Sequence, residues 1–268
     1  MPKFDSSKTM ECFGGDGPPI VLVHGFGADS YSWLATAPEL AKHAKVFTLE
    51  LPGHGNAWDI PAAAGLEPLS EQIITPAINK AARECNAPVH LIGHSLGGAL
   101  AMLAAAHDTV HDRAQIASLS LIAPLGLGSG ANADFIEKYV ALDDEPATLE
   151  LLQRTVFNDR LISGQLIKPL LLHLRKDGVR TTLQAIGDAV LTPSNELSQA
   201  VEQISSGDLP RQVIWGLNDH IIPLVKDDEN RFGGHWHTME NCGHLPHIEM
   251  RVQVNRLLLD IVRRSTGV

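Results

Sequence analysis

The chain has 268 residues, of which 44% are hydrophobic and 19% are charged, and its formal net charge is −10. This composition excludes wholesale disorder, and the length is sufficient to bury a full core. The acidic balance argues against binding to phosphate backbones or to anionic bilayers, so we expect neither nucleic acid nor a membrane as a partner.

The N-terminal residues lack the apolar core of a secretory signal, and the longest apolar stretch, residues 91–106, is shorter than the ~20 residues that cross a bilayer. The three cysteines, Cys12, Cys85 and Cys242, are odd in number and widely spaced, so they predict neither a disulfide framework nor a metal clip. We therefore expect a reduced cytoplasmic protein without a cofactor, either a monomer or a homodimer.

Short apolar runs alternate with helical patterns in the first half of the chain. Runs of this length suit strands that are buried on both faces, and their alternation with helices indicates a parallel sheet. The expected strands are residues 20–23, 46–49, 89–92 and 119–122, and the expected helices are residues 31–43 and 70–85.

This alternation stops after Gly130. Helical periodicity dominates from there to about residue 206, and strand-like runs return only at 212–215 and 235–238, before a last helix at 246–263. We therefore predict an α/β core with a mostly parallel sheet of about seven or eight strands flanked by helices. The predicted core comprises residues 1–128 and 209–268, and a helical cap at 129–208 is inserted in it.

Residues 93–97, Gly-His-Ser-Leu-Gly, lie where the expected strand at 89–92 meets a helix, and they match the pattern G-x-S-x-G. In that pattern the glycines permit a very tight turn, and the serine is exposed at the helix start, close to backbone N–H groups and the positive end of the helix dipole. The pattern predicts that Ser95 is a nucleophile. The alternative is a glycine-rich helix cap with a spare serine.

Further motifs follow in a fixed order, and with them the chain resembles the α/β-hydrolase family over nearly its whole length. Residues 23–27 look like the family's oxyanion loop, 51–55 like the loop after its fourth strand, 215–223 like its acid loop and 241–244 like its histidine loop. The resemblance implies the α/β-hydrolase fold.

A closer resemblance comes from residues 121–128, residues 134–136 and the helical block. They are similar to the hydrolase-like C-terminal domain of acetoin dehydrogenase acyltransferase (dihydrolipoamide acetyltransferase) subunits. A lipoyl domain precedes that region in the family. Only about a strand's length of chain precedes Val21 here, so we expect no lipoyl domain and a shortened first hairpin.

A serine needs a neighbouring base to act as a nucleophile. His244 is the predicted base, and Asp219 would hold its neutral tautomer and stabilise the imidazolium. Both follow strands, so their side chains should emerge at the carboxyl edge of the sheet. The weaker alternatives are Asn218, Asp227 and Asp228 for the acid and His247 for the base.

An oxyanion hole needs two donors where negative charge develops. We predict the backbone N–H groups of Leu96 and Phe26, and Phe26 could at the same time form a wall of the pocket. The mostly apolar cap predicts an apolar or uncharged acyl group. Candidate pocket residues are Phe135, Tyr139 and Ile221, together with Leu151, Leu152, Leu171 and Leu172.

Several histidines could suggest zinc, but no H-E-x-x-H motif or cysteine pair supports a metal site, and we predict none. His24, His54 and His94 lie in motifs where the family has structural hydrogen bonds.

The predicted function is hydrolysis of a small carboxylic ester, thioester or lactone through a Ser–His–Asp triad and an acyl-enzyme. Two alternatives stay open: an acyltransferase component related to acetoin dehydrogenase complexes, and a non-catalytic ligand-binding protein.

Overall fold

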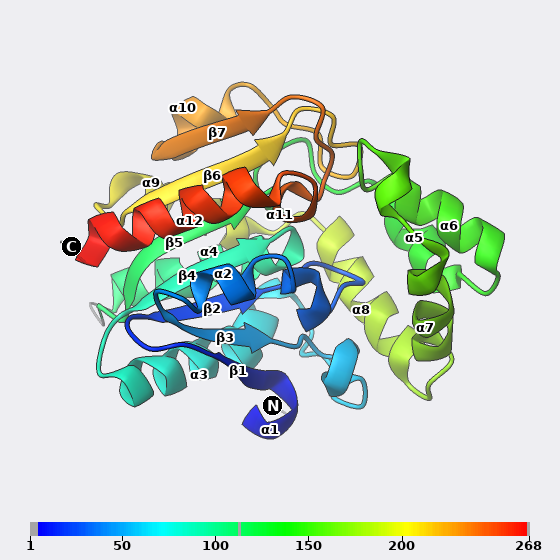
Figure 1. Cartoon of the computed structure of the whole chain (residues 1–268), viewed down its shortest axis with the longest axis horizontal. Helices are drawn as coiled ribbons and strands as arrows, with labels where there is room; N and C mark the ends of the chain where they lie inside the picture. The colour runs from blue at the N-terminus through cyan, green and yellow to red at the C-terminus, as the bar shows by residue number, and fades with distance from the viewer. Residues whose placement is uncertain (1–4, 112–113, 267–268) are drawn as a thin grey trace.

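The computed structural model describes residues 5–111 and 114–266, and within them seven strands form one sheet in the order β1-β3-β2-β4-β5-β6-β7 (Figure 1). β1 runs antiparallel to β3, and all other neighbours in this sheet are parallel. The strands are β1 (Met10–Gly14), β2 (Pro19–Val23), β3 (Lys45–Leu49), β4 (Val89–His94), β5 (Ile116–Ile122), β6 (Arg211–Gly216) and β7 (His235–Met239).

The predicted fold class is confirmed, and each of the six apolar runs forms a strand. β2 and β4 are buried along their whole length, because helices cover both faces of the sheet. β1 alone was not visible as an apolar run. It is an edge strand in which Met10 is buried and the next three residues are exposed. Within the described residues it is the single strand before β2.

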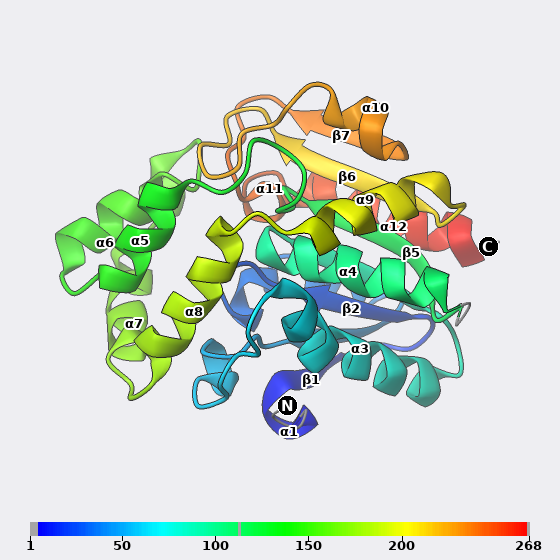
Figure 2. The same cartoon turned by 180° about the vertical axis from the view of Figure 1, so that it is seen from behind.

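Helices pack on the two faces of the sheet, as the views from both sides show (Figures 1 and 2). Alternate residues of β2 serve the two layers, because successive side chains of a strand point to opposite faces. Val21 and Val23 join one apolar cluster, and Ile20 and Leu22 join the other. The first layer contains α3 (Leu66–Cys85), α4 (Leu96–Val110), α9 (Asn195–Ser206) and α10 (Asp228–Phe232), and the second contains α2 (Ala37–Leu40), α11 (Pro246–Glu249) and α12 (Arg251–Thr266).

Two predicted helices are interrupted. The segment 31–43 forms only a 3-10 turn, η1 (Ser30–Trp33), and the short α2, which has Pro38 in its first turn. Proline has no N–H to donate and is tolerated in the first turn of a helix but not in its interior, so Pro38 fits the start of α2 and not the middle of one continuous helix. The last predicted helix is divided at Met250, whose backbone (φ −117°, ψ 37°) leaves the helical region. The remaining short elements are α1 (Ser6–Thr9) and η2 (Gly55–Ala57).

Four helices lie beyond the carboxyl ends of the strands, at the right of Figure 1. They are α5 (Ala133–Ala141), α6 (Glu145–Gln153), α7 (Gly164–Leu174) and α8 (Val179–Leu191), with the 3-10 turn η3 (Asp159–Leu161) between α6 and α7. The predicted block also included α9, which instead packs on α4 beside the sheet (Figure 2). Its buried stripe of Leu197, Val201 and Ile204 faces the core layer. The cap that we propose therefore comprises α5 to α8.

Within the described ranges, no helix combines the length and the apolar character that crossing a bilayer requires.

Candidate active site

Ser95 occupies a strained turn between β4 and α4. Its backbone lies at φ 54° and ψ −118°, a conformation that residues other than glycine rarely adopt. Such strained conformations occur mostly at functional sites. The turn closes with glycine on both sides. A Cβ atom on Gly93 would lie 2.4 Å from the carbonyl oxygen of Gly97, and one on Gly97 would lie 2.4 Å from that of Val23. The turn therefore requires the glycines of the G-x-S-x-G pattern.

Asp219 and His244 lie next to each other. Asp219 follows β6, His244 follows β7, and the Nδ1 atom of His244 is 2.7 Å from Oδ2 of Asp219. The second carboxylate oxygen, Oδ1, accepts hydrogen bonds from the N–H groups of Ile221 at 2.8 Å and Ile222 at 2.9 Å. Both side chains of the pair are buried. A carboxylate held in this way accepts a proton-bearing Nδ1, which leaves Nε2 of His244 as the basic nitrogen.

Neighbouring groups hold the histidine loop. The backbone N–H of His244 donates to the carbonyl oxygen of Thr155 at 2.8 Å. The backbone carbonyl oxygen of His244 accepts from Nε2 of His94 at 2.9 Å. The Glu249 carboxylate accepts from the N–H groups of Gly243 at 2.7 Å and Phe157 at 2.8 Å. Glu249 thus ties the histidine loop to the segment after α6. No motif marked this role, since it depends on backbone N–H groups, one of which is 92 positions away in the sequence.

The weaker candidates for acid and base have other surroundings. Asp227 is exposed, and Asp228 is buried but accepts from the N–H of Gly128 at 2.6 Å and pairs with Arg231 at 3.1 Å. His247 is fully buried, with its ring 4.7 Å from the ring of Trp33. Burial lowers the pKa of His247 to about 3, so the ring is neutral at physiological pH.

The predicted oxyanion donors lie on either side of Ser95. Leu96 is the first residue of α4, and Phe26 belongs to the loop after β2. This loop touches the nucleophile turn: a Cβ atom on Gly25 would lie 3.0 Å from the Cβ atom of Ser95. In the described parts of the chain, neither the Leu96 nor the Phe26 N–H has a hydrogen-bond acceptor. Both donors are therefore available to a ligand.

The histidines that suggested a metal bind the backbone of these loops. Nδ1 of His24 is 2.8 Å from the carbonyl oxygen of Gly25, and Nε2 of His54 accepts from the N–H of Gly27 at 2.9 Å. His54 is fully buried, and burial lowers its pKa to about 3. A neutral His54 can accept the Gly27 proton, whereas a charged ring could not.

A cavity of about 200 Å³ lies between Ser95 and the cap. Among its lining residues are the candidates Phe135, Tyr139, Ile221 and Leu152 and the catalytic candidates Ser95 and His244. The other three candidates lie elsewhere, since Leu151 and Leu171 are buried outside this lining and Leu172 is 64% exposed. Helical periodicity does not distinguish residues that line the cavity from residues that are buried elsewhere or exposed. Other lining residues were not predicted from the sequence, among them Ile136, Val190, Leu245 and Ile248.

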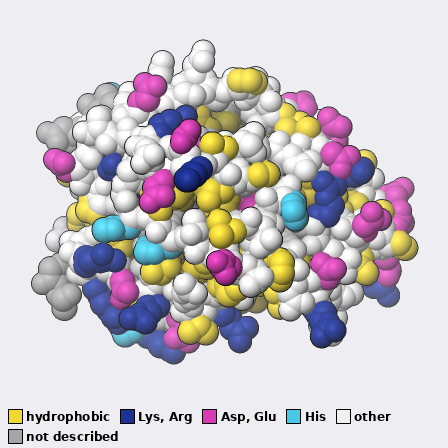
Figure 3. All heavy atoms as spheres, turned by 90° about the horizontal axis from the view of Figure 1, so that it is seen from above, with side chains coloured by type: hydrophobic (Ala, Val, Ile, Leu, Met, Phe, Trp, Pro, Cys, Tyr) yellow, Lys and Arg dark blue, Asp and Glu magenta, His cyan; other side chains and the backbone are white. Residues whose placement is uncertain are grey.

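The cavity differs from the surface around it. Charged side chains of both signs occur on the outer surface at the cap end of the molecule, on the right in Figure 3. No Asp, Glu, Lys or Arg is found among the described residues that line the cavity, and its polar groups are few, chiefly Ser95, His94, His244 and Thr155. The lining is therefore an apolar wall around one polar corner.

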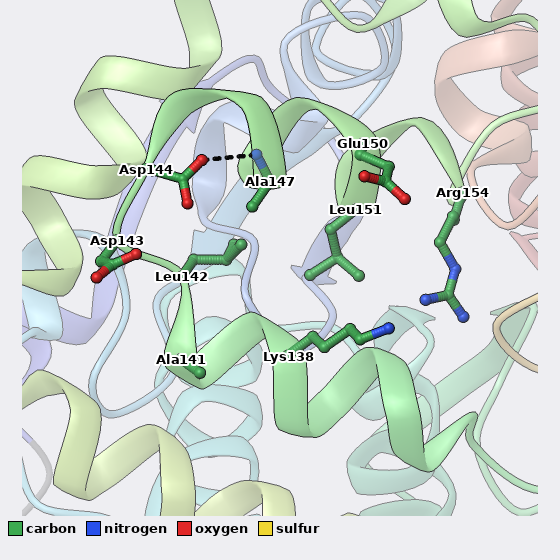
Figure 4. Close-up of a pocket in the computed structure, with 9 residues that line it drawn as sticks. All are labelled: Lys138, Ala141, Leu142, Asp143, Asp144, Ala147, Glu150, Leu151 and Arg154. Carbon is green, nitrogen blue, oxygen red and sulfur yellow. Dashed lines mark hydrogen bonds between the residues drawn. The ribbon is translucent and has the colours of Figure 1, made fainter.

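A separate hollow of about 330 Å³ lies between α5 and α6 (Figure 4). It is lined by charged residues such as Lys138, Glu150 and Arg154 and contains none of the catalytic candidates. Asp144 at its rim accepts from the N–H of Ala147 at 2.8 Å and so caps the start of α6. This hollow is thus distinct from the site at Ser95.

Comparison with known proteins agrees with the motifs. Residues 20–257 match the alpha/beta hydrolase family. The dihydrolipoyllysine-residue acetyltransferase component of the acetoin cleaving system of Pseudomonas putida is 31% identical over 256 residues, which are 95% of this chain and 66% of that relative. The chain therefore spans slightly less than two thirds of that relative's length. Both resemblances noted in the sequence are confirmed.

Relatives with hydrolase names are also similar. Monoacylglycerol lipase ABHD6 of Bos taurus is 26% identical over 273 residues, which cover 92% of this chain and 76% of the lipase. The structure of the meta-cleavage product hydrolase CumD from Pseudomonas fluorescens IP01 superposes with a TM-score of 0.76 at 20% identity, over 96% of this chain and 94% of CumD. At that identity the superposition shows a shared fold.

Proposed function

The chain belongs to the alpha/beta hydrolase family, and from that membership we propose that it is a serine hydrolase acting on a small carboxylic ester, thioester or lactone. One observation carries the proposal. His244, which is buried and whose Nδ1 lies 2.7 Å from Asp219, lines the same cavity as Ser95, which is held on a strained turn. A serine on a strained turn and an imidazole oriented by a carboxylate, both lining one cavity, support nucleophilic catalysis by serine.

The proposed reaction has two steps. In the first, Nε2 of His244 takes the Ser95 hydroxyl proton, Oγ bonds to the substrate carbonyl carbon, and the bond to the alcohol or thiol breaks as His244 returns the proton to the leaving group. In the second, water replaces Oγ by the same route and releases the acid. Asp219 stabilises the imidazolium in each step, and the N–H groups of Phe26 and Leu96 would bind the oxyanion.

The cavity lining supports an uncharged, apolar acyl group. Apolar side chains dominate it, and each Å² of apolar substrate surface buried there contributes about 25 cal/mol. An acyl chain with a carboxylate would lose its hydration without meeting a cation among the described lining residues. We therefore place esters of unsubstituted fatty acids ahead of esters of dicarboxylic acids as substrates.

Hydrolysis of short esters by the wild type and two serine variants tests the proposal. Ser95→Ala should abolish hydrolysis of short p-nitrophenyl esters down to the residual ~10³–10⁴-fold enhancement over water that can persist without a triad member. The matched control is Ser129→Ala, which removes an exposed serine outside the cavity lining and should hydrolyse the esters as the wild type does. Equal turnover by Ser95→Ala would reject the serine mechanism. A wild type without turnover would favour the non-catalytic ligand-binding alternative.

A second candidate function is acyl transfer, and the 31% identity to an acetyltransferase component favours it. Transfer would use the same acyl-enzyme, with a thiol instead of water as the second nucleophile. Adding dihydrolipoamide to the ester reaction distinguishes the two. If thioester forms at the expense of free acid at millimolar thiol, the chain is an acyltransferase. If the acid remains the product, hydrolysis is its reaction.

A further inference from the structure

A tyrosine of the cap reaches the oxyanion loop. The hydroxyl of Tyr139, in α5, donates a hydrogen bond to the carbonyl oxygen of Gly27 at 2.5 Å. The tyrosine ring covers the glycine so closely that a Cβ atom on Gly27 would lie 2.4 Å from it, and it meets the ring of Phe26 edge-on at 5.4 Å. Burial raises the pKa of Tyr139, so the hydroxyl remains a donor across the physiological range.

The core holds the same loop from the other side. The carbonyl of Gly25, which shares its peptide group with the Phe26 N–H, accepts from His24 at 2.8 Å, and the Gly27 N–H donates to His54 at 2.9 Å. These two contacts come from the α/β core. The Gly27 carbonyl, by contrast, has its partner in the cap.

Gly27 is the point at which the loop most needs such a contact. Its φ of +73° lies in the left-handed region, which glycine enters freely, and glycine has the widest choice of alternative conformations. Without a partner for its carbonyl, the peptide group between Gly27 and Ala28 could turn, and the short loop that carries the Phe26 N–H would move with it. A donor stabilises an oxyanion strongly only when its direction is set before the reaction.

We propose that Tyr139 is a positioning residue through which the cap sets the geometry of the oxyanion loop. The inference rests on the proposed function, because it concerns the donor that would bind the oxyanion. It separates two roles of Tyr139, whose ring lines the cavity while its hydroxyl binds Gly27. The cap would then contribute to the rate of the chemical step as well as to the choice of acyl group.

Tyr139→Phe tests this role, because it removes the hydroxyl and keeps the ring. For a short acetate ester we expect kcat to fall about tenfold, as loss of a buried hydrogen bond would cause, with KM within a factor of two. The affinity for a methyl trifluoromethyl ketone should fall by the same factor, since Ser95 Oγ adds to its carbonyl and the resulting oxyanion occupies the same hole. The matched control is Tyr31→Phe, the same change at a side chain that is 71% exposed.

The concentration of folded enzyme is measured by titration with a fluorophosphonate, and kcat is calculated per titrated site. A lower yield of folded Tyr139→Phe then does not alter the result. Unchanged kcat and ketone affinity in Tyr139→Phe would overturn the inference, and so would a rise in KM at constant kcat, which would indicate a role in substrate binding alone. These outcomes leave the proposed function intact. A wild type that neither reacts with the fluorophosphonate nor hydrolyses esters would overturn the proposed function and the inference together.

Discussion

Oδ2 of Asp219 lies 2.7 Å from Nδ1 of His244, while Oδ1 of the same carboxylate is occupied by two backbone N–H groups. The two oxygens thus have different partners: Oδ1 accepts from the backbone of its own loop, and Oδ2 accepts from the imidazole of His244. Trp215 adds a donor, with Nε1 at 3.2 Å from Oδ2. The direction of the carboxylate is therefore set by the loop after β6, independently of His244.

This division predicts the effect of Asp219→Asn. The amide oxygen can still accept from the backbone, but its NH₂ group cannot accept the Nδ1 proton of His244, so the histidine would favour the wrong tautomer. We expect kcat to fall by ~10⁴-fold, as loss of the orienting charge does in triads of this kind. Ester kinetics with a parallel thermal melt provide the measurement. Asp227→Asn is the control, because Asp227 is exposed. If Asp219→Asn retained most of the activity, Asp219 would not be the acid.

Phe135→Ala should change the acyl-length preference. Phe135 is buried and lines the cavity, and pockets of this kind distinguish acyl chains by ~1–3 kcal/mol per methylene. We expect the ratio of kcat/KM for an octanoate to an acetate ester to rise as the cavity widens. The ratio cancels any loss of folded protein. Leu172→Ala, at a cap position that is 64% exposed, should leave it unchanged. Equal losses on all esters in folded Phe135→Ala would mean that the cap does not choose the acyl group.

Tyr139→Ala would not test the pocket alone. Its hydroxyl binds Gly27, so truncation would alter the cavity and the oxyanion loop at once.

Gly97→Ala should damage the fold itself. The new methyl group would lie 2.4 Å from the carbonyl oxygen of Val23 and 2.5 Å from that of His24, and both atoms belong to the backbone. Overpacking of this kind costs about 3 kcal/mol of the free energy of unfolding. Gly164→Ala is the control, because a Cβ atom there meets nothing within 4 Å at the start of α7. It should be neutral or stabilising by up to ~1 kcal/mol. Urea unfolding measures the free energy of unfolding of both variants. A Gly97→Ala variant as stable as the wild type would contradict the tight packing of the turn.

The parts of the fold that were predictable from the sequence have local signals. Strands such as β2 and β4 are short apolar runs because both of their faces are buried. The turn at Ser95 is marked by glycines that no other residue could replace. Asp219 and His244 each follow a strand, and parallel strands bring their carboxyl ends to one edge of the sheet. The structure brings these two residues together; their catalytic roles remain predictions.

The parts that were not predictable depend on contacts over long distances in the sequence. Tyr139 and Gly27 are separated by 112 positions, and the bond between them ends on a backbone carbonyl, which has no signature in the sequence. The same holds for Glu249 and the N–H of Phe157, which are 92 positions apart, since almost any residue at 157 would have an N–H. The position of α9 was missed for a different reason. An amphipathic stripe shows that a helix is buried on one side, but not which surface covers it.

Stability should fall in acid because several buried histidines are neutral. Burial lowers the pKa of His54 and His247 to about 3 and that of His90 to about 4, whereas the unfolded value is near 6.5. Between these values the unfolded chain binds more protons than the folded one. The free energy of unfolding should therefore decrease as the pH falls below about 6.5, by up to ~1.4 kcal/mol per pH unit for each histidine.

His247→Phe isolates one of these contributions. Neither ring nitrogen of His247 has a hydrogen-bond partner within the described chain, so the substitution sacrifices no such contact there. Urea unfolding of wild type and variant at pH 7.5, 6 and 5 should give a shallower pH dependence for the variant. Identical slopes would show that His247 is not held neutral by the fold.

Mass spectrometry of the fluorophosphonate adduct tests the central claim most directly. In the labelling reaction Ser95 Oγ would bond to phosphorus, fluoride would leave, and His244 would take the hydroxyl proton. We expect an adduct on the peptide that contains Ser95 in the wild type and no labelling of folded Ser95→Ala. An adduct on a different residue, or labelling of Ser95→Ala at the wild-type rate, would contradict the assignment of Ser95 as the nucleophile.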